Sequence, residues 1–121
     1  MGKDLSYSVK KFVTNALTSH KKVTRVYQFP HEEEIIIGVD RTEGLSSVII
    51  HMSDAYRYSL HNYDMRPEEL KENSFILIAR PEAGFDDEVI SVAREDSIGV
   101  GQIGKLLGAL NREYVWTYEL P

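Results

Sequence analysis

Side chains of the types that bind metal ions gather between residues 40 and 54. Asp40 and Glu43 follow one apolar stretch and His51 lies within the next, so carboxylates and imidazole could meet across a hairpin. Such a set suits a hard cation such as Mg²⁺, or acid–base chemistry. A structural role is favoured, because the two acids also suit a turn before Gly44, and interior histidines are usually hydrogen-bonded. Asp40, Glu43 and His51 are thus candidate metal ligands without a stereotyped spacing.

Basic and aromatic side chains form a second candidate site, of a kind that binds nucleic acid. Residues 1–30 carry six basic side chains against one acidic side chain, a net charge of +5, whereas residues 31–121 carry eight against eighteen, a net charge of −10. A basic patch binds phosphate, and tyrosines interleaved with arginine stack on bases. The favoured alternative is a solvated helix face beside an acidic body, with the tyrosines at the rim of a sheet. The candidate nucleic-acid-binding residues are Lys10, Lys11, Lys21, Lys22, Arg25, Tyr56, Arg57 and Tyr58.

A glycine motif near the end of the chain offers a third chemistry. Gly99, Gly101 and Gly104 match G-x-G-x-x-G, which binds a dinucleotide where a strand opens into a helix. That fold needs an acid about 20 residues further on, but only seventeen residues follow Gly104, and the one late acid is Glu119. The stretch before the motif reads as a helix. We therefore expect the glycines to permit tight packing, and no nucleotide cofactor.

Composition limits the class of protein. The chain has 121 residues, of which 42% are hydrophobic and 27% charged, so we expect a single domain over residues 1–121. With no cysteine, it has no disulfide, no catalytic thiol and no cysteine-bound metal. The lack of cysteine fits a reducing cytosol, and the lack of a long apolar run and of a signal-peptide pattern predicts a cytoplasmic protein that does not associate with membranes.

Hydrophobic periodicity predicts the secondary structure. Helices are expected at 4–19, 67–72, 86–96 and 102–111, and strands at 23–29, 33–40, 47–52, 74–79, 98–100 and 114–120. The strands at 33–40 and 74–79 are apolar on both faces, which is typical of central strands covered on both sides. Residues 53–66 show no clear period and could be strand or loop. The predicted fold class is α/β, with a mixed, mostly antiparallel sheet of about five strands and about three helices.

This order of elements resembles the restriction-endonuclease-like fold of the PD-(D/E)XK nucleases. The resemblance covers most of residues 4–102 and rests on the element pattern, with Ser74-Phe75-Ile76-Leu77-Ile78-Ala79-Arg80-Pro81 followed by a helix and Ile98-Gly99-Val100-Gly101. It implies a metal-binding Asp on the second strand, where Asp40 stands, and Glu-x-Lys on the third strand. That strand has Ile49-Ile50-His51 instead, and Glu69-Leu70-Lys71 falls on a later helix. The resemblance therefore implies a copy that is inactive as a nuclease.

These observations favour a non-enzymatic binding or interaction module, with nucleic acid as the first partner class to test. An aromatic last strand, carrying Tyr114, Trp116 and Tyr118, also predicts a homodimer formed by edge pairing. The first alternative is a metal-dependent phosphodiesterase with a degenerate site, for which Mg²⁺ is the possible cofactor. The second is a dinucleotide-binding protein.

Overall fold

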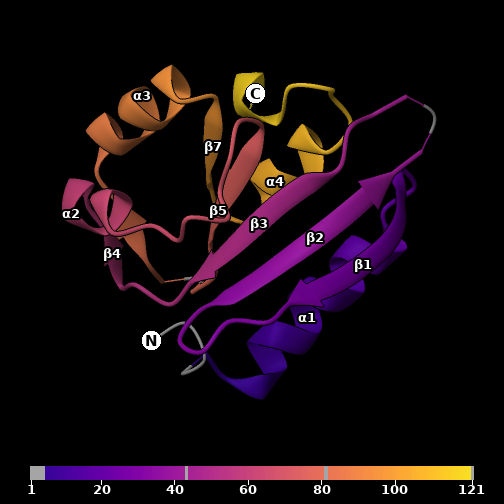
Figure 1. Cartoon of the computed structure of the whole chain (residues 1–121). Helices are drawn as coiled ribbons and strands as arrows, with labels where there is room; N and C mark the ends of the chain where they lie inside the picture. The colour runs from indigo at the N-terminus through magenta and orange to yellow at the C-terminus, as the bar shows by residue number, and fades with distance from the viewer. Residues whose placement is uncertain (1–4, 43, 81, 121) are drawn as a thin grey trace.

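One helix and a three-strand meander begin the fold, and strands separated by helices complete it. The computed structural model describes residues 5–42, 44–80 and 82–120 (Figure 1). Its elements are α1 (Tyr7–Ser19), β1 (Val23–Phe29), β2 (Ile35–Arg41), β3 (Val48–Ser53), β4 (Arg57–Tyr58), α2 (Leu60–Asp64), β5 (Ser74–Ile78), β6 (Gly84–Phe85), α3 (Asp87–Glu95), β7 (Ile98–Gly101), α4 (Ile103–Ala109) and the 3₁₀ turn η2 (Val115–Thr117).

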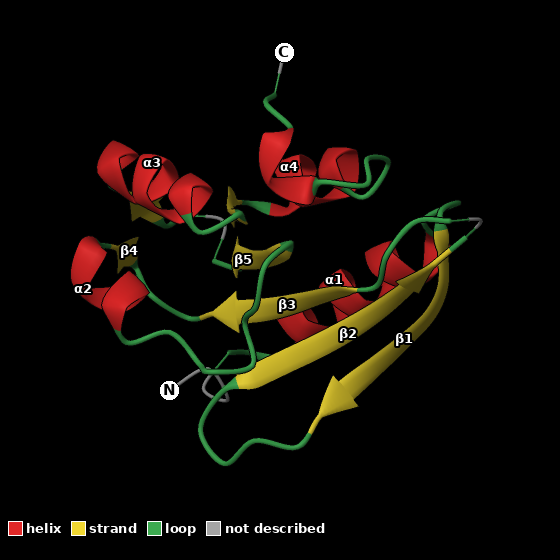
Figure 2. Cartoon of the chain, turned by 45° about the horizontal axis from the view of Figure 1, so that its top comes forward, coloured by secondary structure: helices red, strands yellow, loops and turns green. Residues whose placement is uncertain are grey.

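The main sheet has five strands in the order β1-β2-β3-β5-β7. β1, β2 and β3 pair antiparallel, whereas β5 lies parallel to β3 and β7 lies parallel to β5. The parallel pairs need crossovers, which run through α2 and α3 (Figure 2). The predicted α/β class with a mixed five-stranded sheet is confirmed.

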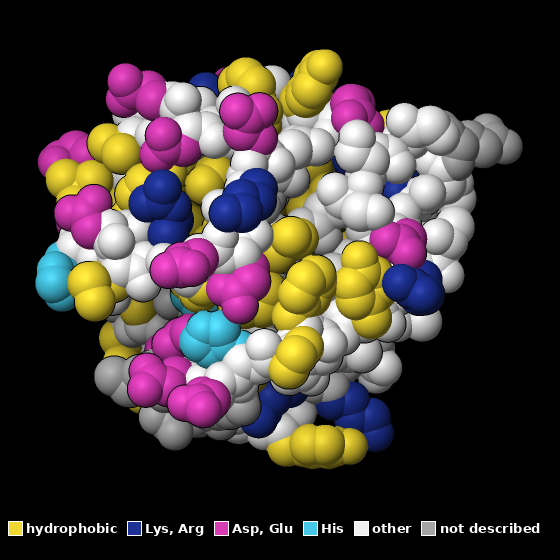
Figure 3. All heavy atoms as spheres, in the orientation of Figure 1, with side chains coloured by type: hydrophobic (Ala, Val, Ile, Leu, Met, Phe, Trp, Pro, Cys, Tyr) yellow, Lys and Arg dark blue, Asp and Glu magenta, His cyan; other side chains and the backbone are white. Residues whose placement is uncertain are grey.

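Alternating side chains divide the interior into two hydrophobic clusters, one on each face of the sheet. On β5, Phe75 and Leu77 join α1 and α4 in the first cluster, whereas Ile76 and Ile78 join α2 and α3 in the second. This is the double coverage that an all-apolar strand predicts. Figure 1 shows that neither α2 nor α3 covers the near face of β1, β2 and β3, and Figure 3 shows hydrophobic side chains exposed there.

The C-terminal segment differs from its prediction. Residues 114–120 are not a strand; the chain forms η2 and then continues without regular structure to Leu120. The side chain of Asn73 accepts a hydrogen bond from Val115 N at 2.8 Å and donates one to Glu113 O at 2.6 Å. Because a side chain satisfies these backbone groups, the segment adds no strand to the sheet. The aromatic strand on which the predicted homodimer depended is therefore absent from the described structure.

The short helix before β5 lies earlier in the chain than predicted. α2 spans Leu60–Asp64 and is held by a capping box, in which Ser59 and Asn62 each bond the other's backbone N–H. The predicted helix at 67–72 is instead a turn, closed by a hydrogen bond from Leu70 N to Pro67 O at 3.2 Å. The ambiguous residues 53–66 thus contain both a two-residue strand, which pairs with β6, and a helix.

Candidate functional site

Asp40 is tied to its neighbours at the end of β2. Its carboxylate lies 3.2 Å from Arg25 Nε, and it accepts hydrogen bonds from Tyr27 Oη at 3.3 Å and from Ser47 Oγ at 2.7 Å. One cation and two hydroxyls therefore already share this carboxylate, and a metal ion would have to displace them.

The structure separates Asp40 from His51. His51 is opposite Ile36 in the β2–β3 register, and Asp40 lies four residues further along β2, about 13 Å away at strand spacing. Glu43 lies outside the described residues. Within the described part of the chain, no three His, Asp or Glu side chains are placed to hold a metal ion together.

Lys21, Lys22 and Arg25 lie at the opposite end of the sheet from the tyrosine segment. Lys22 is beside the end of β2, because its carbonyl accepts a hydrogen bond from Thr42 N at 2.9 Å. Tyr56 follows β3, which runs antiparallel to β2 and ends beside the start of that strand. Lys10 and Lys11 lie on α1, and Lys21 lies in the turn after it. The eight candidates therefore do not form one surface.

Tyr58 is a correction to the nucleic-acid candidates. Its ring is 1% exposed and packs in the second hydrophobic cluster, so it cannot stack on a base. Arg57 is paired with Asp86, its Nε lying 2.8 Å from Oδ1. Tyr56 is exposed, and the Arg80 guanidinium lies 4.2 Å from the centroid of its ring.

The glycine motif does follow a strand and open a helix, but packing accounts for its most confined members. A Cβ at Gly99 would lie 2.6 Å from the Phe75 ring, and one at Gly101 would lie 2.6 Å from the Lys105 side chain. A Cβ at Gly104 would meet nothing within 4 Å. Two of the three glycines thus admit close neighbours rather than a ligand.

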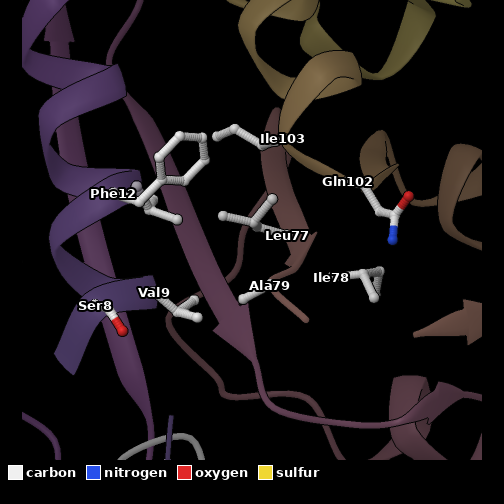
Figure 4. A pocket seen from close by; sticks show the side chains of 9 residues that line it. Ser8, Val9, Phe12, Leu77, Ile78, Ala79, Gln102 and Ile103 are labelled. Atoms are coloured by element: carbon white, nitrogen blue, oxygen red, sulfur yellow. The ribbon is translucent and has the colours of Figure 1, made fainter. Parts of the chain in front are cut away.

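An apolar groove opens between α1 and the ends of β5 and β7. We call it the α1 groove; its volume is about 480 Å³. Figure 4 shows Val9 and Phe12 on one side of it and Leu77 and Ile103 on the other. Phe12 is 59% exposed, a large fraction for a phenylalanine. The remaining lining residues are Ser8, Val13, Ile78, Ala79 and Gln102.

A second, polar cavity of about 630 Å³ lies where β3 ends and β2 begins. We call it the Glu34–His51 cavity, because His51 Nε2 lies 2.8 Å from Glu34 Oε1 in its wall. Acidic and histidine side chains gather in this region, at the lower left of Figure 3. The other lining residues are Glu33, Ser53, Asp54, Ala55, Tyr56, Tyr58, His61, Asn62, Met65 and Arg80.

Comparison of the chain with protein-family models, with curated proteins and with solved structures gave no match. Within the described residues, no helix combines the length and the apolar character needed to cross a membrane. The structural observations above therefore carry the functional argument.

Sequence reasoning missed Glu34 and Arg41. Glu34 stood in a run of three acids that reads as solvated loop. Arg41 is buried, and its guanidinium donates to the carbonyls of Leu110 at 3.0 Å and Glu113 at 3.1 Å, which ties the end of β2 to the C-terminal segment. Burial lowers the pKa of Arg41, and nearby Glu113 opposes that effect. Neither the bond of Glu34 to His51 nor the bonds of Arg41 to the C-terminal segment could be predicted from the charge of the side chain.

Proposed function

We propose that this protein is a non-enzymatic binding module that holds an acidic, amphipathic segment of a partner protein in the α1 groove. The observation that supports it is the groove itself, an apolar hollow with Phe12 exposed at its edge. Apolar grooves beside a helix are a recurrent way to bind the apolar face of an amphipathic segment. An exposed aromatic side chain at such a site is a natural anchor.

Charge favours an acidic partner. α1 carries Lys10 and Lys11 immediately next to the lining residues Val9 and Phe12, and it has no acidic residue. A partner with carboxylates flanking its apolar residues would pair with these lysines. A second copy of this chain is less suitable, because two α1 helices facing one another would bring the lysines together.

Nucleic acid is the competing partner class, and the geometry supports it less. Lys21, Lys22 and Arg25 lie at the opposite end of the sheet from the tyrosine segment, Tyr58 is buried, and Arg25 is paired with Asp40. The acidic residues 31–121, with a net charge of −10, would also repel phosphate.

We also propose that the nuclease-like resemblance extends to the fold and not to catalysis. Asp40 is engaged by Arg25, Tyr27 and Ser47, and the third strand has Ile49 and His51 where the family has Glu and Lys. Mg²⁺-dependent cleavage of DNA or RNA that Asp40→Ala abolishes would contradict this.

The test measures fluorescence anisotropy of two labelled amphipathic peptides. They share leucines at i, i+3, i+4 and i+7 and differ only in carrying glutamate or lysine on the polar face. We expect only the glutamate peptide to bind, with an affinity that falls as salt rises. Phe12→Ser should weaken binding about tenfold or more, and Lys10→Glu with Lys11→Glu should weaken it further.

Tyr114→Ser is the matched control, because Tyr114 is also 59% exposed and is not among the residues that line the groove. It should leave the affinity unchanged. Equal binding of both peptides, or of neither, would contradict the proposal. In the third arm, labelled single- and double-stranded DNA and RNA are titrated at about 50 and 200 mM salt. Salt-sensitive binding of nucleic acid, without binding of either peptide, would mean that the protein is a nucleic-acid-binding module and not a peptide-binding one.

A further inference from the structure

The Glu34–His51 cavity is distinct from the α1 groove. Among the described residues, the two have no lining residue in common. Its wall combines the segment before β2, the end of β3 and helix α2, so elements far apart in sequence meet there. Polar side chains from all three line one hollow, and convergent polar groups in a concave site are what orients a small ligand.

Two side chains of this wall carry a buried polar atom without a partner. His51 is 6% exposed and Tyr58 is 1% exposed. Among the described residues, neither Nδ1 of His51 nor Oη of Tyr58 has a hydrogen-bond partner. Buried polar groups in folded proteins are nearly always paired, and each unpaired one lowers stability. Two such atoms in the wall of one cavity point to a ligand that supplies the missing partners.

The hydrogen bond between His51 and Glu34 determines whether Nδ1 of His51 needs a donor or an acceptor from the ligand. A carboxylate only accepts hydrogen bonds, so His51 donates its Nε2–H to Glu34, at 2.8 Å. In the neutral ring this leaves a lone pair on Nδ1, which accepts. Burial raises the pKa of the Tyr58 hydroxyl above its ordinary value, so Tyr58 is protonated at neutral pH. The ligand must therefore donate a hydrogen bond to Nδ1 of His51, while the Tyr58 hydroxyl, which both donates and accepts, can accept a second one.

The charges of the wall determine the charge of the ligand. Glu33, Glu34 and Asp54 place three carboxylates in the lining against one guanidinium, that of Arg80. Arg80 is already engaged, since its Nε donates to Asp54 O and its guanidinium stacks on Tyr56. A hydrogen-bond donor among carboxylates and tyrosines is best supplied by a cation.

We propose that the Glu34–His51 cavity binds an organic cation that carries primary ammonium groups, with the ammonium donating to His51, Tyr58 and the carboxylates. An ammonium group has three donors and no acceptor, which matches this wall. The same chemistry is offered by a free linear polyamine and by a lysine side chain.

Isothermal titration calorimetry with putrescine and spermidine tests the proposal, beside 1,4-butanediol and succinate as neutral and anionic analogues. We expect both amines to bind and neither analogue to do so. Asp54→Asn should raise the dissociation constant about tenfold. Glu88→Gln removes one carboxylate from an exposed position of α3 instead, and it should leave the dissociation constant unchanged.

A capped tetrapeptide with one lysine distinguishes the two sources of the ammonium group. Binding of the peptide without binding of the free amines assigns the ligand as a lysine side chain, and binding of the free amines assigns it as a polyamine.

Tyr58→Phe separates a binding role from a structural one. The change removes only a hydroxyl that has no partner in the described protein, so the melting temperature should stay the same or rise. Amine affinity should nevertheless fall about tenfold. Absence of binding by the amines and the peptide, equal binding of 1,4-butanediol, or amine binding unaffected by both Asp54→Asn and Tyr58→Phe would overturn the proposal.

Discussion

His51 Nε2 lies 2.8 Å from Glu34 Oε1, across the junction between the start of β2 and the end of β3. The imidazole is buried, and this is the hydrogen bond that its ring makes within the described structure. Seventeen positions separate the two residues in the chain. The bond thus fixes the entry to β2 against β3 and forms one wall of the polar cavity.

Removing the Glu34 acceptor should destabilise the protein. In Glu34→Ala Nε2 of His51 loses its partner, which leaves both nitrogens of the buried ring unpaired, so the free energy of unfolding should fall by about 1–3 kcal/mol. Glu34→Gln keeps an oxygen acceptor and should cost clearly less. Urea denaturation of both variants is the measurement; equal losses would mean that the hydrogen bond contributes little.

The glycine motif can be tested as a packing device. Gly99→Ala would place a Cβ 2.6 Å from the Phe75 ring, and it should lower stability by about 1–3 kcal/mol. Gly104 lies in α4 with nothing within 4 Å of an added Cβ, so Gly104→Ala should raise stability by about 0.5–1 kcal/mol. Thermal melts of both variants, with and without NAD or FAD, provide the check. Stabilisation of the wild type by either dinucleotide, lost in Gly99→Ala, would restore the cofactor hypothesis.

Arg41 should hold the C-terminal segment in place. Arg41→Met leaves the carbonyls of Leu110, Arg112 and Glu113 without their shared donor, at a cost of about 2–4 kcal/mol. Arg112→Met removes an exposed guanidinium from the same segment and should change stability by less than about 0.5 kcal/mol. Denaturation curves measure both effects, and limited proteolysis after residue 110 should accelerate only in Arg41→Met. A similar loss in both variants would refute this role.

Stability should depend on acid pH through Glu113. Hydrogen bonds from the Ser46 hydroxyl and backbone N–H hold the pKa of the Glu113 carboxyl below its ordinary value of 4.5, and nearby Arg41 adds to this. A carboxyl whose pKa is lowered by folding stabilises the fold above pH 4.5 and loses that contribution as the pH falls through the folded pKa.

Ser46→Ala should therefore be less stable than the wild type near pH 7 and should converge with it as the pH falls below 4.5 through the folded pKa of Glu113. Urea midpoints across this range are the measurement. In a Glu113→Gln background the same substitution should show no such convergence, because no proton is taken up at residue 113. A constant difference at every pH in the original background would disprove the linkage.

How far the sequence predicts the fold can be judged from particular segments. The apolar run at 74–79 indicated a strand covered on both faces, and β5 is buried at every position. The prediction succeeds because neighbouring side chains of a strand point to opposite faces of the sheet, so burial on both faces requires a continuous apolar run in the sequence. Tyr56 and Tyr58 show the limit: two residues apart and alike in sequence context, one is exposed and the other is 1% exposed. The second hydrophobic cluster, assembled from α2, α3 and the parallel strands, decides between them.

The sequence by itself therefore determined the α/β class, the central strands and the charge imbalance between the first 30 residues and the rest, because these depend on composition and local period. Only the tertiary structure decided that Glu34 meets His51, that Asp40 is paired with Arg25 and that residues 115–117 form a turn. Each of those outcomes depends on a hydrogen-bond or ion-pair partner brought from elsewhere in the chain, and such partners leave no periodic signal in the sequence.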